Sequence, residues 1–389
     1  MSRAGSPTTG RSPGPLVVAR SATNREAERE DDLDPGLLTI LVRRAVETDT
    51  EAVIAFVRDT WDGWDYLPDV WASWLAARDG AVFAAEIASG ADPGMAGEAR
   101  PGEATRPGRP IAVGRVALLG PTEAWMEGLR VDPAVRGHGV ATAFQIAELT
   151  WTQAQGVSVV RYTTGETNEA SLHLGAKHGF DLAGRWRGVR PAGAEGAPGE
   201  ARAAQPVARH TILARLDRAG LIARSPQEDP WRRLSEDATF LAGDHLYEWR
   251  AWAWQELTPE RLASHLQRGE LLAVDGDGGW SVGLLAGERL PGETRVVLLG
   301  GGAGPAQRLV NAVTAAAERR PIIRLPDPSP LLDDLAPRLA ADGWRVGERS
   351  LVLMERALRD VTGPVVLPAE GLDRVRFAEE PRPLGLIPA

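Results

Sequence analysis

Hydrophobic and polar positions alternate along residues 123–131, which favours a β-strand that buries one face. Pro133 follows and ends the strand, because proline cannot donate to a ladder of hydrogen bonds. From Val140 the apolar residues recur at helical spacing to about Gln155. The sequence therefore predicts a strand, a glycine-containing turn over residues 136–141, and a helix.

Alternation, which favours strands, and helical spacing also predict elements on both sides of this unit. We expect a first helix that begins near Thr48 or Asp49. Further helices are expected at 69–77 and 168–178, with strands at 38–46, 80–87, 111–119, 157–163, 180–187 and 209–216. A second, similar series follows, with strands at 246–255, 270–275, 280–287, 294–299, 322–325 and 345–356 and helices at 259–267, 305–319 and 331–341.

The remaining stretches indicate how the chain is divided. Residues 89–110 and 191–206 carry no apolar period and are expected to be flexible insertions. Because 389 residues are comfortable for two domains, we expect folded units at 37–216 and 236–360. Three polar or proline-rich segments then remain, namely a disordered tail at 1–36, a linker at 217–235 and a Pro-rich tail at 361–389.

Composition narrows the range of functions. The chain has no cysteine, which removes disulfides, thiolate metal sites and cysteine nucleophiles. Its six histidines show no metal-binding spacing, so we expect no metal. A net charge of −9 argues against a nucleic-acid partner, and no apolar run approaches the ~20 residues of a membrane span. We expect a cytoplasmic protein that is a monomer or a homodimer.

The turn over residues 136–141 has the properties of an anion-binding site. A helix start leaves backbone N–H groups without partners, and the helix dipole makes that end partly positive. Gly137 and Gly139 lack a Cβ, so a diphosphate can approach the amides closely. Arg136 can add a charge-assisted hydrogen bond. The P-loop and the dinucleotide fingerprint do not fit, because the required lysine and a third glycine are missing.

Two motifs resemble those of a known family. Arg136, Gly139 and Ala141 match the acetyl-CoA signature Arg/Gln-x-x-Gly-x-Gly/Ala of the GCN5-related N-acetyltransferases, after a Val-x-Pro lead-in at 131–133. A second family motif is matched at Asn168, Leu174, Lys177, Gly179 and Phe180. The resemblance implies an α/β (α+β) fold, a mixed and largely antiparallel sheet flanked by helices, with residues 37–216 as the catalytic domain.

The second series of elements resembles a tandem copy of the same fold. Its counterpart to the turn is the glycine-rich stretch 300–305, which has neither the lead-in nor the arginine. Pro305 also removes one N–H donor. We therefore expect residues 236–360 to form a degenerate domain that does not hold CoA.

The resemblance implies acetyl-CoA as cosubstrate. Leu129 and Val131 would offer backbone groups to its pantetheine arm, while strand parity places Arg130 on the face opposite Glu127. Asn168 is expected either to bond the CoA arm or to cap its own helix. The residues expected at the cosubstrate are Leu129, Arg130, Val131, Arg136, Gly137, His138, Gly139, Val140, Ala141 and Asn168.

Acetyl transfer to an amine needs a base for the amine and an acid for the departing thiolate. Glu127 is the expected base, acting directly or through water, and Glu123 ranks second; a solvated or ion-paired carboxylate is the alternative explanation. The family usually carries its acid, a tyrosine, at the position of Gly175 in this chain. Tyr162, Tyr66 or water would then replace it.

The acceptor side has a weaker signal. Asp65-Tyr-Leu-Pro68, followed by Trp71 and Trp74, is similar to the vertebrate histidine N-acetyltransferase branch, which implies a small α-amino acid as acceptor. Asp65, Tyr66 and Glu127 would contact this amine, and Arg115 or Arg161 would meet its carboxylate. The spacing of the two tryptophans is itself more typical of core packing.

Two other functions remain open. One is a protein or peptide N-acetyltransferase, which needs an open acceptor groove. The other is a non-catalytic acyl-CoA-binding regulator, which Gly175 favours and which the intact turn and Glu127 oppose.

Overall fold

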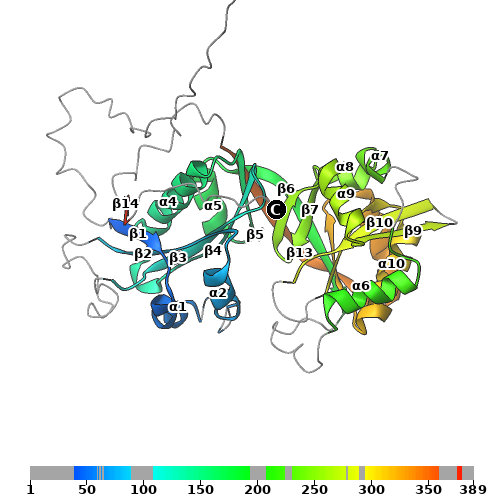
Figure 1. Ribbon diagram of the computed structural model, residues 1–389, viewed down its shortest axis with the longest axis horizontal. Helices are drawn as coiled ribbons and strands as arrows, with labels where there is room; N and C mark the ends of the chain where they lie inside the picture. The colour runs from blue at the N-terminus through cyan, green and yellow to red at the C-terminus, as the bar shows by residue number, and fades with distance from the viewer. Residues whose placement is uncertain are drawn as a thin grey trace, which may run out of the picture.

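The computed structural model describes residues 39–58, 60, 63, 65–88, 108–192, 207–223, 230–276, 279–288, 294–358 and 375–378. The expected disordered tail at 1–36 and most of the insertions and the Pro-rich tail lie outside these residues. The described strands form one sheet of 12 strands and a separate pair, β7 and β8. This mixed, largely antiparallel sheet with flanking helices confirms the expected fold class (Figure 1).

The first half of the chain, residues 39–192, contributes six strands. They are β1 (Ile40–Arg44), β2 (Gly80–Ile87), β3 (Ala112–Leu118), β4 (Glu123–Val131), β5 (Val159–Gly165) and β6 (Asp181–Pro191). One face of the sheet packs against α1 (Thr50–Val57) and α2 (Leu67–Ala76), and the other against α4 (Val140–Ala154) and α5 (Glu169–Lys177). Short 3-10 turns, η1 (Glu47–Asp49) and η3 (Pro133–Val135), precede α1 and α4.

The second half, residues 207–358, has its own helices and strands. The helices are α6 (Arg209–Arg218), α7 (Pro230–Ser235), α8 (Ala238–Ala242), α9 (Pro259–Gln267), α10 (Ala303–Ala317) and α11 (Pro330–Ala341). The strands are β7 (Leu246–Arg250), β8 (Ala253–Glu256), β9 (Leu271–Gly276), β10 (Gly279–Leu285), β11 (Arg295–Gly301), β12 (Ile322–Pro326) and β13 (Trp344–Ala357). A further strand, β14 (Val375–Phe377), pairs with β1.

Two predicted elements differ in the structure. Residues 209–216, predicted as a closing strand, are helical as α6, because Ile212 and Leu216 lie four apart and bury one helical stripe in the second core. The strand predicted over 246–255 is the β7–β8 hairpin, which turns at Trp252 with a φ of 66°. The prediction for 209–216 was therefore wrong, and another segment must close the sheet of the first half.

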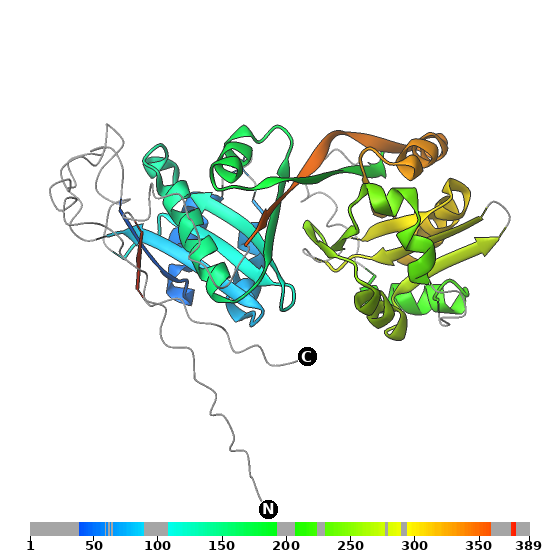
Figure 2. The same cartoon turned by 90° about the horizontal axis from the view of Figure 1, so that it is seen from above.

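That segment is β13, which joins the two halves. It pairs antiparallel with β6 over Trp344–Glu355 and with β5 over Leu351–Ala357. Strand β6 in turn pairs with β12, so the sheet runs in the order β14-β1-β2-β3-β4-β5-β13-β6-β12-β11-β10-β9. Figure 2 shows β6 and β13 running side by side between the two lobes. Each half thus places a strand in the sheet of the other.

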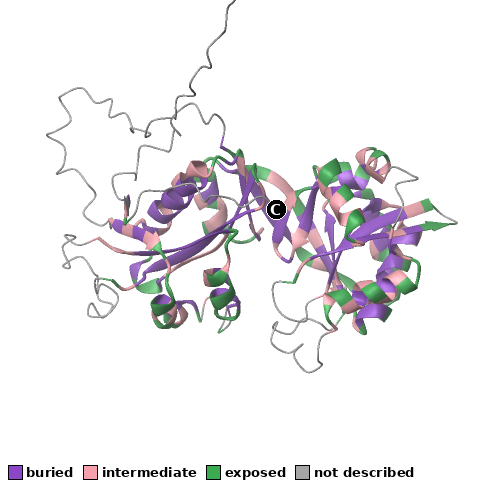
Figure 3. Ribbon diagram, in the orientation of Figure 1, coloured by how far each residue is buried: buried purple, intermediate pink, exposed green. Residues whose placement is uncertain are grey.

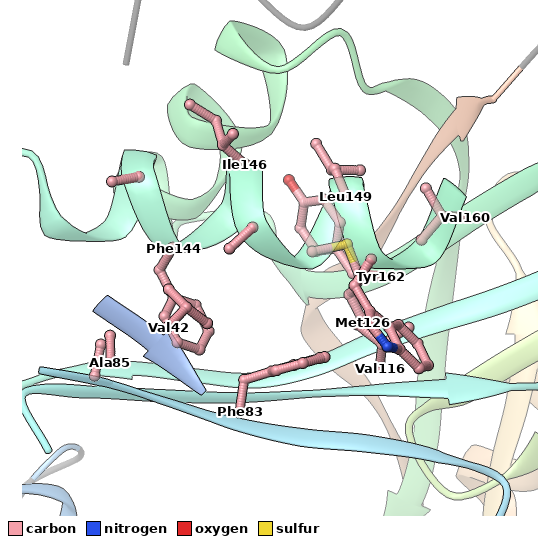
Figure 4. Packing of buried hydrophobic residues seen from close by; sticks show 14 of the residues in the cluster. Val42, Phe83, Ala85, Val116, Met126, Phe144, Ile146, Leu149, Val160 and Tyr162 are labelled. Atoms are coloured by element: carbon pink, nitrogen blue, oxygen red, sulfur yellow. The ribbon is translucent and has the colours of Figure 1, made fainter. Parts of the chain in front are cut away.

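Hydrophobic packing follows the strand exchange, because the core of the first half includes residues of β13. Figure 3 shows strands that are largely buried and helices that carry both buried and exposed residues. The core under α4, part of which is drawn in Figure 4, includes Tyr162 and Met126 and also Val352 and Met354 from β13. At the junction, the rings of Trp125 and Trp186 lie 6.1 and 5.6 Å from that of Trp254. Such aromatic pairs contribute about 0.5–1.5 kcal/mol each beyond the buried area.

Candidate functional site

The turn between β4 and α4 has the backbone geometry of an anion-binding site. Gly137 and Gly139 adopt left-handed angles, with φ of 81° and 74°. Gly139 is the N-cap of α4 and supplies no capping side chain. A Cβ on Gly137 would meet no described heavy atom within 4 Å. The first amides of α4 therefore lack a side-chain cap, and the space in front of Gly137 is open to a ligand.

The side chains of the turn support this arrangement. Val140 is buried and fixes the first turn of α4 in the core, while Ala141 is partly exposed. Arg136 is exposed, and its Nε donates to the carbonyl of Val131 at 3.3 Å. Nδ1 of His138, which is partly exposed, lies 2.9 Å from the carbonyl oxygen of Arg136. Two cationic or polar side chains thus border the open amides.

Strands β4 and β5 separate beside this turn. Their ladder joins Glu123–Trp125 to Val159–Arg161, although β4 continues to Val131 and β5 to Gly165. Within the described residues, no ladder joins the two strands beyond this point. Leu129 and Val131 pack against the core beneath α4 on this stretch of β4. Its edge toward β5 is available to an extended ligand that carries amide groups.

A β-bulge at Gly128 changes which side chains share a face. Val113 pairs with Arg130 and Arg115 with Glu127, so one residue of β3 opposes two of β4. Gly128 has a φ of 74°, and a Cβ there would lie 2.6 Å from the ring of Trp74. Arg130 therefore lies on the same face as Glu127, and the predicted opposite placement was wrong because strand parity does not hold across a bulge.

The acceptor residues expected from the sequence gather on this face. The buried Asp65 accepts from Nε of Arg130 at 2.7 Å and from the amide of Leu67 at 2.9 Å. Its carboxylate thus orients Arg130 and the start of α2. The buried Tyr66 lies edge-on to Trp74, at 6.1 Å between ring centroids, with the guanidinium of Arg130 over its ring. Trp71 and Trp74 are core residues as predicted, and Trp74 also borders the site.

Glu127 is the carboxylate at the centre of this face. Its side chain is 4% exposed and forms ion pairs with Arg115 of β3 and, at 2.9 Å, with Arg250 of β7. Glu123, the second-ranked base, is buried and bound by Arg161 at 3.2 Å and Arg261 at 2.7 Å. Glu123 is therefore part of the junction between the halves, and Glu127 is the carboxylate nearer the turn.

The hydroxyl of Tyr162 lies beside Gly175, the position at which the sequence resemblance implied a tyrosine. A Cβ on the buried Gly175 would overlap the Tyr162 hydroxyl. That hydroxyl donates to the carbonyl of Ser171 at 3.0 Å, and the ring packs edge-on against Phe180. Burial raises the pKa of Tyr162 to about 12, although the hydrogen bond to Ser171 acts in the other direction. The phenol of β5 thus lies, in protonated form, where a side chain of α5 would otherwise lie.

This placement predicts that Tyr162→Phe lowers kcat about tenfold or more while acetyl-CoA affinity changes little, because only a proton donor is removed. Since its pKa is raised, Tyr162 keeps its proton until the pH approaches 12. The wild-type rate should therefore show no loss from this group between pH 8 and pH 10, in a kcat profile measured across that range. An unchanged kcat in Tyr162→Phe would contradict a role of Tyr162 as the proton donor to the departing thiolate.

The side chain of Asn168 caps its own helix, α5, in the structure. Its Oδ1 accepts from the amide of Ser171 at 3.3 Å, and its Nδ2 donates to Oγ1 of Thr164 at 2.9 Å. It is the N-cap of α5. Of the two expected roles, capping is the one that the geometry shows, and a bond to the CoA arm would require these contacts to break.

The second half contributes residues that the sequence did not indicate. Arg250 and Arg261 contact Glu127 and Glu123 across 123 and 138 positions of chain. The β7–β8 hairpin that carries Arg250 packs Trp254 against Trp125 on the same face. Three tryptophans between positions 249 and 254 were the only local signal for this contact.

The second glycine turn is closed by a carboxylate of the chain itself. Asp237 accepts from the amide of Gly301 at 2.9 Å and also caps α8 through Thr239 and Phe240. A Cβ on Gly300 would lie 2.6 Å from this carboxylate. An anionic ligand at the head of α10 would meet the negative charge of Asp237, so the geometry favours the interpretation of this turn as degenerate.

The described residues contain no group of three His, Asp or Glu side chains placed to hold a metal ion. Among the helices of the described segments, none has both the length and the apolar character needed to cross a membrane.

Comparison with known proteins gives one family. The model of the Acetyltransferase (GNAT) family matches residues 61–180, which include the turn, Glu127 and Tyr162. No curated protein matches the chain.

Solved structures also resemble it at low identity. A GCN5-related N-acetyltransferase from Sphaerobacter thermophilus is 18% identical, covers 84% of this chain and 97% of its own, and has a TM-score of 0.47. A putative acetyltransferase from Thermoplasma acidophilum is 14% identical, with 82% and 99% covered and a TM-score of 0.45. The match of the family model, by itself, assigns residues 61–180 of this chain to the acetyltransferase (GNAT) family.

Proposed function

We propose that the protein moves an acetyl group from acetyl-CoA directly to the primary amine of a small molecule, such as the α-amino group of a free amino acid. The observation that most supports a small acceptor is the contact of Arg250 with Glu127. Because of it, the acceptor face of β4 has α2 on one side and the β7–β8 hairpin on the other. A protein segment would need an open groove there.

The turn and the separated strands fit acetyl-CoA. The uncapped amides of α4, with Arg136 beside them, would hold the diphosphate. The pantetheine arm would run along the free edge of β4 at Leu129 and Val131. This path brings the thioester between Glu127 on one side of β4 and Tyr162 on β5.

The chemistry requires one bond to form and one to break. The amine nitrogen attacks the thioester carbonyl, and the C–S bond breaks to release the CoA thiolate. Glu127 accepts a hydrogen bond from the amine and takes its proton directly or through water. Tyr162 gives its proton to the thiolate and regains one from solvent. No acyl-enzyme is needed, which agrees with a chain that has no cysteine.

The second half is proposed to be a degenerate copy of the acetyltransferase fold that no longer binds CoA. Asp237 at the head of α10 and Pro305 within its first turn both support this. One acetyl-CoA per chain is then expected.

The test is CoA release from acetyl-CoA with a panel of free amino acids. Wild type should turn over at least one of them, and Glu127→Gln should lower its kcat about 100-fold, because general acid–base catalysis contributes 10²–10⁴-fold. Glu51→Gln, which removes an exposed carboxylate on α1, is the matched control and should leave kcat unchanged.

The alternatives give different results in the same assay. Release with peptides but with no free amino acid would indicate a protein N-acetyltransferase. Tight acetyl-CoA binding without release for any amine would indicate a regulator and would refute the proposed function.

A further inference from the structure

Arg250 extends from the second half into the acceptor side of the first. Its NH2 group donates to Oε1 of Glu127 at 2.9 Å, and its side chain is 15% exposed. The guanidinium lies over the ring of Trp249, with 5.5 Å to the centroid. Within the described residues, its Nε and NH1 groups donate to no acceptor. Arg250 therefore has unused donors on a partly open surface beside Glu127.

The other arginines of this region are already engaged. Arg115 shares its guanidinium between Glu127 and Asp79, the latter at 2.6 Å. Arg161 is held between Glu123 and Glu355. These are the two residues from which the sequence predicted a carboxylate anchor. Their charges are matched by protein carboxylates, so a substrate carboxylate would have to displace one.

Arg130 is engaged as well. Its Nε and NH2 donate to Asp65 at 2.7 and 3.2 Å, and its NH1 donates to the carbonyl of Leu129. By contrast, Arg250 has one recorded carboxylate oxygen, Oε1 of Glu127, and Arg115 uses the same oxygen. Because Arg115 also pairs with Asp79, the shared oxygen of Glu127 is the one protein acceptor of Arg250 among the described residues, and the guanidinium keeps donors for a second carboxylate.

The second half holds Arg250 in place. The next residue, Ala251, donates its amide to the carbonyl of Gly287 at 2.9 Å. The guanidiniums of Arg295 and Arg324 lie over the ring of Trp252 at the tip of the hairpin, at 5.6 and 5.3 Å from its centroid. Its amide donates to the buried Glu248 at 2.7 Å. The hairpin tip is thus fixed by buried charges, and Arg250 is presented in a defined position.

We propose that Arg250 is a specificity-determining residue that binds the carboxylate of an α-amino acid acceptor, so that the second half supplies one wall of the acceptor site. The inference rests on the proposed function. An α-amino acid carries an ammonium and a carboxylate on one carbon, and Glu127 and Arg250 present the opposite charges side by side. The ammonium faces Glu127, and the carboxylate accepts from the unused donors of Arg250.

The experiment uses pairs of acceptors that differ only in the carboxylate, such as histidine with histamine and phenylalanine with phenethylamine. Steady-state kcat/KM is measured for wild type, Arg250→Ala and Arg250→Lys. In Arg250→Ala we expect a loss of roughly 10–100-fold for the amino acid, mainly in KM, and less than about threefold for its decarboxylated partner. Arg250→Lys keeps the positive charge but lacks the paired N–H donors of a guanidinium. Its kcat/KM for the amino acid should therefore lie between those of wild type and Arg250→Ala.

Arg338→Ala, which removes an exposed arginine of α11, is the matched control and should leave both acceptors unaffected. Acetyl-CoA affinity of each variant, measured by calorimetry, confirms that the fold is intact. An equal loss for both members of a pair, or no loss for either, would overturn the role of Arg250 while leaving the acetyltransferase itself in place. If wild type turned over no amine at all, the proposed function would fail, and the proposed role of Arg250 in binding the acceptor carboxylate would fail with it.

Discussion

A chain that ends at residue 223 is expected to be insoluble and to bind no acetyl-CoA, although it contains the whole of residues 61–180. The reason is that β13 lies beyond the cut. It supplies the partner of β5 over Leu351–Ala357 and of β6 over Trp344–Glu355. Thermal unfolding followed by circular dichroism, with pelleting of the expressed fragment, measures the result.

The lost contacts are large enough to decide the outcome. The core under α4 would lose Val352, Met354 and Leu358. The buried Glu123 would lose Arg261, and Arg161 would lose Glu355; losing one partner of a buried ion pair costs up to about 3–5 kcal/mol, and less where a second partner such as Arg161 remains. Together these lost contacts amount to a large part of the 5–15 kcal/mol free energy of unfolding of a typical domain.

The control cuts the chain without removing anything. Co-expression of 1–200 with 201–389 interrupts only a segment between β6 and α6, and both fragments should copurify as one soluble complex. A soluble 1–223 fragment that unfolds cooperatively and binds acetyl-CoA would show that the strand exchange is dispensable.

Gly137→Leu is expected to weaken acetyl-CoA binding at least about 100-fold. The space in front of Gly137 is open among the described residues, so the new side chain would occupy the place of the diphosphate. Loss of two charge-assisted hydrogen bonds from backbone amides, at about 1.5–3 kcal/mol each, corresponds to a factor of 100 or more. Isothermal titration gives the affinity.

Gly156→Leu separates this effect from backbone strain. Gly156 follows the other end of α4, with a φ of 76° and no described heavy atom within 4 Å of a Cβ. Both substitutions place leucine in left-handed backbone, at a cost of roughly 1–2 kcal/mol. Equal losses of stability, with a loss of affinity only in Gly137→Leu, would assign the effect to the turn.

The elements of the fold were predictable where the signal is local. The strand at 123–131 has the predicted bounds, and the helix after it ends one residue before the predicted end, because period, proline and glycine lie within one short stretch. The bulge at Gly128 was not predicted, and the face of Arg130 was therefore wrong. A glycine inside a strand was the available sign, since it often marks a bulge.

Contacts between distant parts of the chain were beyond the sequence alone. The absence of a tyrosine at position 175 was visible in the sequence. The position of Tyr162 beside Gly175 depends on how β5 packs on α5. The exchange of β13 and the reach of Arg250 to Glu127 join residues that no local pattern relates. Such pairings depend on tertiary packing, which periodicity does not encode.

Titration of acetyl-CoA into the full-length wild-type protein tests the central claim most directly. The account predicts saturable binding with one site per chain, which Gly137→Leu removes and Gly156→Leu retains. Absence of binding, two equivalent sites, or unchanged affinity in Gly137→Leu would contradict it.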